Sequence, residues 1–160
     1  GATIYGRFTG AGSSCDGYHA TAPAPDGSAI LRAMQRALAD AGREPSHVDY
    51  VNAHGTGTQE NDASESNALH SLFGANIPHT SSTKGYCGHT LAAAGAIESI
   101  ICLLAMQHNT APANVGLTTV DPNLNLSPNL EPLATELSVV MSNSIGFGGN
   151  NCSLIFEKSV

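Results

Sequence analysis

The sequence predicts an α/β fold with a mixed, mainly parallel five-stranded sheet, an antiparallel edge strand and helices on both faces. Three observations support this fold class. Strand-like and helical segments alternate along most of the chain, an order typical of parallel sheets. The last two strand-like segments are separated only by a glycine turn, which implies antiparallel pairing. The length of 160 residues favours a single domain spanning residues 1–160.

Five segments rich in β-branched or aromatic residues are predicted strands, and two segments rich in Gly, Ser, Pro or Asn are predicted loops. The strands lie at residues 2–8, 48–53, 77–83, 138–145 and 152–157. The loops lie at residues 10–28 and 108–135.

Three helices are predicted between these strands. The first has apolar residues at helical spacing over residues 30–41, with Asp26 as a candidate cap and Gly42 as the stop. The second covers residues 59–73 and the third residues 89–107. The third has no polar face, which indicates enclosure on every side, so we expect another domain or subunit to cover it. Its most apolar run is about one turn short of a ~20-residue membrane span and contains Glu98, so no membrane span is expected.

Charge and cysteine content narrow the possible classes of function. Charged residues make up 12% and the net charge is −7, which argues against nucleic-acid binding because such proteins carry a basic surface. Apolar residues make up 41%, which argues against a disordered chain. The four cysteines form no metal or disulfide pattern, so a reducing cytoplasm is expected. The chain opens without Met and without a basic and then apolar leader, so we expect a piece of something longer and no signal peptide.

The first candidate site is the segment VNAHGTGT, directly after a predicted strand. Its histidine, His54, follows the carboxyl end of that strand, where α/β sheets place their ligands. The glycines do not match the phosphate-binding pattern GxxxxGK[ST]. The alternative is a solvent-exposed loop histidine.

The second candidate site is the segment KGYCGH, before the apolar helix. Lys84 is the only Lys or Arg between Arg43 and Lys158, which indicates a specific carboxylate partner. Three acidic residues are candidates for that partner: Glu98, Asp62 and Glu65. His89 is expected at the helix N-terminus, where the dipole disfavours the imidazolium, and a neutral imidazole donates well to an oxyanion. The alternatives are an ordinary loop lysine and a helix-capping histidine.

The third candidate site is the segment NSIGFGGNN between the last two predicted strands. Its glycines predict a tight, flexible turn with free backbone N–H groups, suited to an anion nest or a movable gate. A simple hairpin turn is compatible with either function. No nucleophile is evident, because Cys15 has no base or helix N-terminus nearby in the sequence, so all four cysteines are interpreted as structural.

Together and in this order, VNAHGTGT, KGYCGHTLAAAGAIE and NSIGFGGNN resemble the two histidine motifs and the glycine-rich gate of β-ketoacyl-[acyl carrier protein] synthases. The resemblance covers essentially the whole chain and is to the carboxyl-terminal half of these enzymes, which have a thiolase-like fold. It implies an acyltransferase of fatty acid or polyketide synthesis, acting by decarboxylative Claisen condensation of an acyl thioester with malonyl-acyl carrier protein. The amino-terminal half, with the family's nucleophilic cysteine, is absent, so the fragment alone is expected to be inactive.

The resemblance also implies a catalytic set. His54 and His89 are implied to flank the malonyl thioester and to stabilise its enolate oxygen. Lys84 is implied to hold a charge network with Glu98 rather than to attack the substrate. No metal or redox cofactor is implied, since the phosphopantetheine arrives on the acyl carrier protein.

Binding and supporting roles follow from the same resemblance. Thr56 and Thr58 are implied to hydrogen-bond the phosphopantetheine arm, and Asp62 and Glu65 to orient the loop after His54. The amide of Phe147 is implied to complete the acyl-cysteine oxyanion hole, while its ring gates the acyl pocket.

The expected partners are acyl carrier protein and either the missing amino-terminal half or a second ketosynthase chain, in a homo- or heterodimer. One alternative is a non-catalytic partner subunit similar to chain-length factors. Retention of the implied catalytic set favours the enzyme over that alternative. A free-standing carrier-binding module is the weakest hypothesis, because acidic carrier proteins and a chain of charge −7 repel each other.

Overall fold

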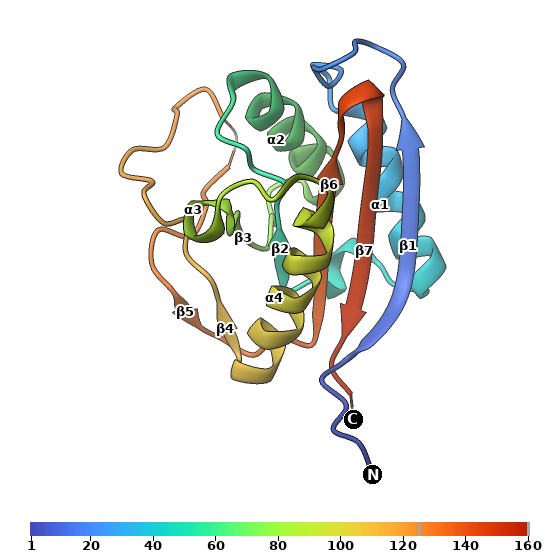
Figure 1. The fold of residues 1–160 in the computed structure, drawn as a ribbon, viewed down its shortest axis with the longest axis vertical. Coiled ribbons are helices and arrows are strands. Elements are labelled where there is room, and N and C mark those ends of the chain that lie inside the picture. Colours follow the sequence, from blue (N-terminus) through green and yellow to red (C-terminus); the bar gives the residue numbers. More distant parts are fainter. Residues whose placement is uncertain (125, 160) are drawn as a thin grey trace.

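A computed structural model describes residues 1–124 and 126–159, and its central feature is a five-stranded mixed sheet (Figure 1). The strand order is β1-β7-β6-β2-β3. β7 pairs antiparallel with both of its neighbours, whereas β2 pairs parallel with β3 and β6. The predicted fold class is therefore confirmed, with the antiparallel strand lying second in the sheet. The strands are β1 (Arg7–Cys15), β2 (Tyr50–Asn52), β3 (His79–Ser81), β6 (Val139–Ile145) and β7 (Asn150–Glu157).

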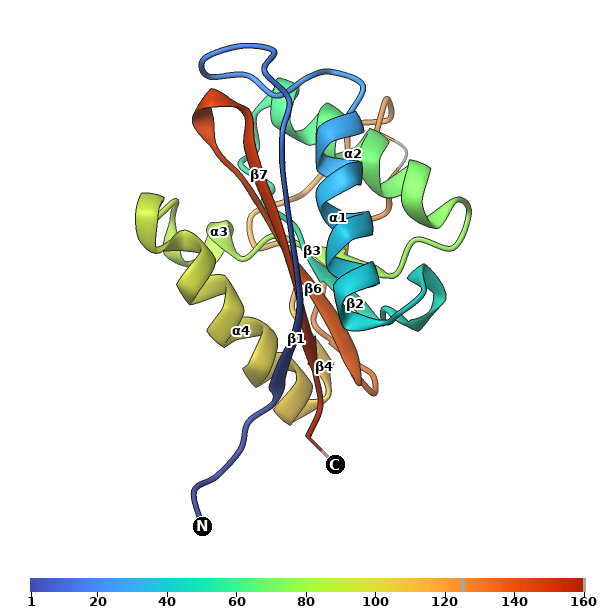
Figure 2. The same cartoon turned by 90° about the vertical axis from the view of Figure 1, so that its right-hand side faces the viewer.

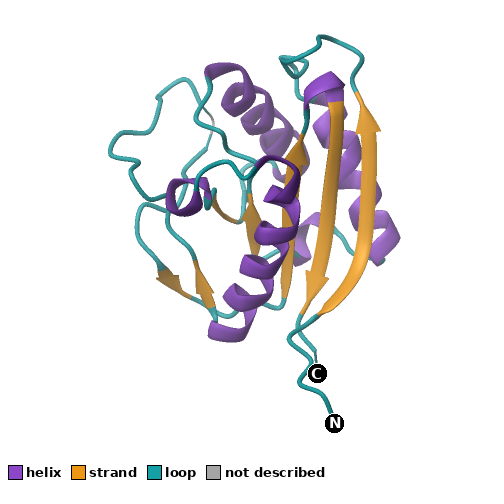
Figure 3. Ribbon diagram, viewed as in Figure 1, coloured by secondary structure: helices purple, strands orange, loops and turns teal. Residues whose placement is uncertain are grey.

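Helices cover both faces of this sheet (Figures 2 and 3). α1 (Ser28–Ala41) and α2 (Gln59–Phe73) lie on one face, and α4 (Ala94–His108) lies on the other. Neighbouring residues of β6 show the division, because Met141 belongs to the core under α1 and α2 while Val140 belongs to the core under α4. Side chains of successive strand residues point to opposite faces, so one strand supports both layers.

The first strand is the main difference from the sequence prediction, since it covers residues 7–15 rather than 2–8. The glycines that suggested a loop are instead where β1 packs against α1. A Cβ added at Gly12 would lie 2.1 Å from the carbonyl oxygen of Ala33. Close packing, which strand propensity does not measure, therefore selects glycine here.

The outer edge of β1 is covered by polar side chains of α1. Ala11 N donates to Asp40 Oδ2 at 2.9 Å, and the Arg36 guanidinium donates to Ser13 O at 2.5 Å. These bonds occupy backbone groups that an edge strand otherwise offers to another strand.

The predicted third helix begins later than expected, and a separate short turn precedes it. α3 (Lys84–Cys87) is a single turn, and α4 begins only at Ala94 after a 3₁₀ turn at Leu91–Ala93. Gly88 and Leu91 have positive φ angles of 71° and 54°, which interrupt the helix. The expectation that His89 lies at the N-terminus of the long helix is therefore wrong.

α4 is enclosed on one side only within the described chain. Cys102 and Met106 face the sheet and are fully buried, whereas Ile100 is 57% exposed and Leu104 is 42% exposed. The segment Leu91–His108 is long and apolar enough to cross a membrane by length and composition alone. It also carries Glu98, which is buried against the rest of the fold.

The predicted loop at 108–135 contains a small second sheet. β4 (Thr110–Ala111) pairs antiparallel with β5 (Leu133–Ala134). Short 3₁₀ turns at Pro45–His47 and Phe147–Gly149 complete the described elements.

Candidate active site

Five of the predicted site residues line one open cavity of about 1350 Å³. The ends of β1 and β6, the start of α4 and the loop after β2 form its walls. The other four predicted site residues are not among those that line the cavity. They are Lys84, Glu98, Asp62 and Glu65. The five residues at the cavity are His54, Thr56, Thr58, His89 and Phe147.

The loop after β2 is held from behind by two carboxylates of α2. His54 N and Gly55 N each donate to Glu65, at 2.9 Å. Gly57 N donates to Asp62 Oδ1 at 3.3 Å. Both carboxylates therefore hold the backbone that carries His54. The ion pair of Lys84 is with Glu98, not with either of these two candidates.

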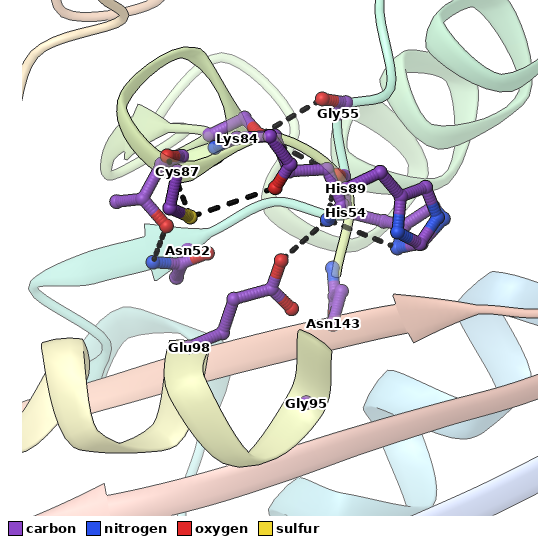
Figure 4. Close-up of polar contacts among 12 residues, drawn as sticks. Asn52, His54, Gly55, Lys84, Cys87, His89, Gly95, Glu98 and Asn143 are labelled. Carbon is purple, nitrogen blue, oxygen red and sulfur yellow. Dashed lines mark hydrogen bonds and ion pairs between the residues drawn. The ribbon is translucent and has the colours of Figure 1, made fainter. Parts of the chain in front are cut away.

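Lys84 binds Glu98 and the same loop through its ammonium group (Figure 4). Its Nζ donates to Glu98 Oε1, to the carbonyl oxygen of His54, and to His54 Nδ1 at 3.3 Å. The Lys84 side chain is 8% exposed and that of Glu98 is 2% exposed. The three N–H donors of the ammonium are thus all engaged within the chain.

The imidazoles of His54 and His89 lie edge to face, with ring centroids 5.4 Å apart and an interplanar angle of 81°. His89 is exposed and His54 is buried. His89 Nδ1 accepts from Leu91 N at 3.1 Å, just as His54 Nδ1 accepts from Lys84. Each neutral ring therefore carries its proton on Nε2. The backbone amide of Leu91 therefore orients the His89 ring.

Burial governs the ionisation of the site. Burial, the nearby Lys84 and His89 together lower the pKa of His54 to about 3, and burial is the largest of the three causes. Burial raises the pKa of Glu98, against the opposing effect of Lys84. Burial also raises the pKa of Glu65, against the opposing hydrogen bonds from the loop after β2. His54 is consequently a neutral hydrogen-bond donor at physiological pH.

The remaining predicted binding residues lie at the mouth of the cavity. Thr56 Oγ1 and Thr58 Oγ1 share a hydrogen bond of 3.0 Å. Phe147 is 76% exposed in the glycine turn before β7. The amide of Gly148 in this turn donates to Ala20 O at 2.8 Å, which ties the turn to the loop after β1.

Two polar residues support the site in ways that the sequence did not predict: Asn143, which belongs to the third candidate segment, and Ser82. Asn143 Nδ2 donates to Glu65 Oε1 at 3.3 Å, and Ser82 Oγ donates to Gly55 O at 2.8 Å. A polar residue in the apolar strand VVMSNSI was a usable signal for Asn143, because a buried amide requires partners. Ser82 gave no comparable signal.

Two of the four cysteines belong to the cavity wall. The four cysteines are free thiols, and Cys15 and Cys152 line the cavity wall. Burial raises the pKa of Cys152. Over residues 1–124 and 126–159, no three His, Cys, Asp or Glu side chains gather in a way that could hold a metal ion.

Comparison with known proteins identifies relatives over nearly the whole chain. The family described as "Beta-ketoacyl synthase, C-terminal domain" matches residues 5–118. The 3-oxoacyl-[acyl-carrier-protein] synthase 2 of Staphylococcus aureus (strain COL) is 44% identical over 162 residues, which cover 99% of this chain and 39% of that protein. The chain thus spans about two fifths of the length of the curated relatives that it matches.

Two solved structures show the same fold at appreciable identity. The ishigamide ketosynthase/chain length factor is 37% identical with a TM-score of 0.93, covering 99% of this chain and 39% of that one. A type II PKS acyl-carrier protein in complex with its ketosynthase, bound to the hexaketide, gives 33% identity and a TM-score of 0.94, covering 99% and 40%.

Proposed function

Because the chain belongs to the β-ketoacyl synthase family, as its carboxyl-terminal domain, we propose that residues 1–160 are the carboxyl-terminal catalytic half of a condensing enzyme. The proposed reaction is the decarboxylative Claisen condensation of an acyl thioester with malonyl-acyl carrier protein, in fatty acid or polyketide synthesis. The observation that carries this proposal is the pair of histidine rings, 5.4 Å apart at one cavity, backed by the buried Lys84–Glu98 pair.

Two Nε2–H donors suit the charge that develops in this reaction. When the malonyl carboxylate leaves as CO₂, the electrons of the broken C–C bond form an enolate, and its oxygen becomes negative. His54 and His89 then stabilise that oxygen by hydrogen bonds formed in the transition state. Burial keeps His54 neutral, so it donates a hydrogen bond without giving up a proton.

The carbanion next requires an acyl acceptor, which we assign to a cysteine on the missing half. The α-carbon attacks the acyl thioester carbonyl, and the cysteine leaves as a thiolate. The Phe147 amide is proposed to complete the oxyanion hole for this step, while its exposed ring gates the acyl pocket. Thr56 and Thr58, at the cavity mouth, are proposed to bind the phosphopantetheine arm.

The proposed partners are acyl carrier protein and an amino-terminal half or second ketosynthase chain, in a homo- or heterodimer of the cytoplasm. An acyl-carrier protein is bound to a ketosynthase in one of the similar structures. The charge of −7 on this chain repels an acidic carrier, which assigns the docking patch to the other half. The enzyme needs no cofactor of its own, because the carrier delivers the pantetheine.

A chimera tests the function directly. The amino-terminal part of the S. aureus synthase, up to the matched region, is joined to this chain and assayed for CO₂ release from malonyl-acyl carrier protein. We expect activity, and we expect His54→Ala and His89→Ala each to reduce it about 100-fold or more, as for loss of an oxyanion donor. A folded, soluble chimera that releases no CO₂ while the intact S. aureus enzyme does would overturn the proposal.

A non-catalytic partner subunit is the second candidate, because one similar structure is a ketosynthase/chain length factor. The intact network of His54, His89, Lys84 and Glu98 favours the enzyme, since a partner subunit has no need of it. The residue that the native amino-terminal half carries in place of the nucleophile decides between the two. A cysteine there supports the enzyme, and another residue supports the partner subunit.

A further inference from the structure

A line of buried polar side chains runs from β7 through β6 to the carboxylate that holds the His54 loop. Ser153 Oγ donates to Asn143 Oδ1 at 2.7 Å, and Asn143 Nδ2 donates to Glu65 Oε1 at 3.3 Å. The exposed fractions of Ser153, Asn143 and Glu65 are 1%, 0% and 3%. Ser153 and Asn143 lie directly opposite each other in the β6–β7 pairing, so the strand register sets their contact.

The hydroxyl of Ser153 and the carboxylate of Glu65 favour the same orientation of the Asn143 amide. An amide has a donating NH₂ group and an accepting oxygen that differ little in size. With Ser153 donating to Oδ1, the NH₂ group faces the carboxylate of Glu65. Without that hydroxyl, the amide oxygen loses its hydrogen bond, and the Asn143 side chain that contacts Glu65 is no longer held from the β7 side.

We propose that Ser153 and Asn143 are positioning residues that set the place of the His54 imidazole through Glu65. The two carboxylate oxygens of Glu65 accept from His54 N and Gly55 N at 2.9 Å each, so a shift of this carboxylate displaces the backbone that carries the ring. The positioning itself follows from contacts within the chain. Only its catalytic consequence rests on the proposed function.

Hydrogen exchange tests the positioning in the 160-residue chain. Exchange of the His54 and Gly55 amides is followed by mass spectrometry in Ser153→Ala and in the control Ser64→Ala. The control removes the hydroxyl of Ser64, which is equally buried and lies on the same helix as Glu65. This hydroxyl also donates one hydrogen bond, to Ala24 O at 2.7 Å. Ser153→Ala should accelerate exchange of the two amides about tenfold, the effect expected for one lost hydrogen bond, and Ser64→Ala should not. Equal exchange in wild type and Ser153→Ala, or equal acceleration in both variants, would overturn the positioning.

A double variant and the chimeric enzyme complete the test. If Ser153 acts through Asn143, Ser153→Ala adds nothing to exchange once Asn143→Leu is present, whereas additive effects contradict the relay. In an active chimera, Ser153→Ala should lower kcat about tenfold and leave KM within about twofold, and Ser64→Ala should change neither. An active chimera with unchanged kcat overturns the catalytic consequence, while an inactive chimera overturns only the proposed function.

Discussion

At the scale of single residues, Lys84 shows how burial decides a role. The three donors of its buried ammonium group are engaged by Glu98 and the His54 loop, so Lys84 neutralises a buried carboxylate and holds the loop backbone. Arg43 and Glu157 form the other ion pair of the described residues, a bidentate pair at the surface. The two pairs provide an internal comparison between buried and exposed charge.

Replacing Lys84 should therefore be costly. Lys84→Ala leaves Glu98 as an unpaired buried carboxylate, and breaking a buried pair costs ~3–5 kcal/mol of the free energy of unfolding. Arg43→Ala, the matched control, should change the stability little, because water replaces a surface partner. Urea unfolding of both variants measures the difference, and equal losses would contradict the assignment of Lys84. In the active chimera, Lys84→Ala should also disrupt turnover.

The low pKa of His54 predicts a pH dependence with a definite sign. In the unfolded chain the His54 imidazole has a pKa of 6.5, whereas in the folded chain its pKa is about 3. The free energy of unfolding should therefore fall as pH falls through this window. Glu65 and Glu98, whose pKa values burial raises, act in the opposite direction. His54→Gln consequently removes part of the acid destabilisation, measured as a smaller slope of stability between pH 4.5 and 6.5. An unchanged slope, or an NMR titration of His54 near its ordinary pKa, would refute the prediction.

Site residues could be predicted from the sequence where they belong to a short motif. They could not be predicted where only a contact in three dimensions brings them to the site. His54, Lys84 and His89 stand in distinctive segments of the sequence. For Lys84 the residues alone allowed three carboxylate partners, the family resemblance implied Glu98, and the structure shows the contact with Glu98, fourteen residues along the chain. The tautomer of His89 depends on the amide of Leu91, which no periodicity reveals.

At the scale of elements, α1 and α2 follow the sequence closely, whereas β1 and α4 do not. Helical spacing and a left-handed glycine stop located α1, which ends at Ala41 before Gly42. The first strand was predicted too early in the chain because Gly10 and Gly12 look like loop residues in the sequence. Both are glycine because β1 packs closely against α1, and such packing produces no periodic pattern in the sequence. The helix containing α4 was predicted to begin too early because the apolar composition continues through the interruption at residues 88–93.

The close approach of β1 to α1 predicts a large effect from a single methyl group. Gly12→Ala places a Cβ 2.1 Å from the carbonyl oxygen of Ala33, so strand and helix must separate. Overpacking of this kind costs at least ~1–3 kcal/mol. Ala11→Val, the control, adds bulk to the same strand at an exposed position and should be nearly neutral. Thermal unfolding compares the two variants, and similar melting temperatures would show that β1 is not confined by α1.

At the scale of the whole molecule, the β1 edge of the sheet is covered, whereas the outer side of α4 is exposed. Side chains of α1 occupy outward backbone groups of β1, so addition of another strand there is disfavoured. The apolar side of α4 remains exposed at Ile100 and Leu104. The chain spans 39% of its S. aureus relative, which leaves ample sequence in a longer protein to cover this face.

We therefore predict that the 160-residue chain associates through α4, either with a partner half or with itself. Leaving each large apolar side chain uncovered forgoes ~1.5–3 kcal/mol, a substantial share of a domain's net stability of ~5–15 kcal/mol. Sedimentation of the isolated chain at micromolar concentration and physiological salt should show oligomers. Ile100→Glu combined with Leu104→Glu should shift it toward monomer, because charge on this face opposes its burial. Gln35→Glu, combined with a second acidic substitution at the exposed Ala39, adds the same charge to an exposed part of α1 on the other layer and should leave the oligomers unchanged. A stable wild-type monomer without partner or detergent would show that α4 needs no cover.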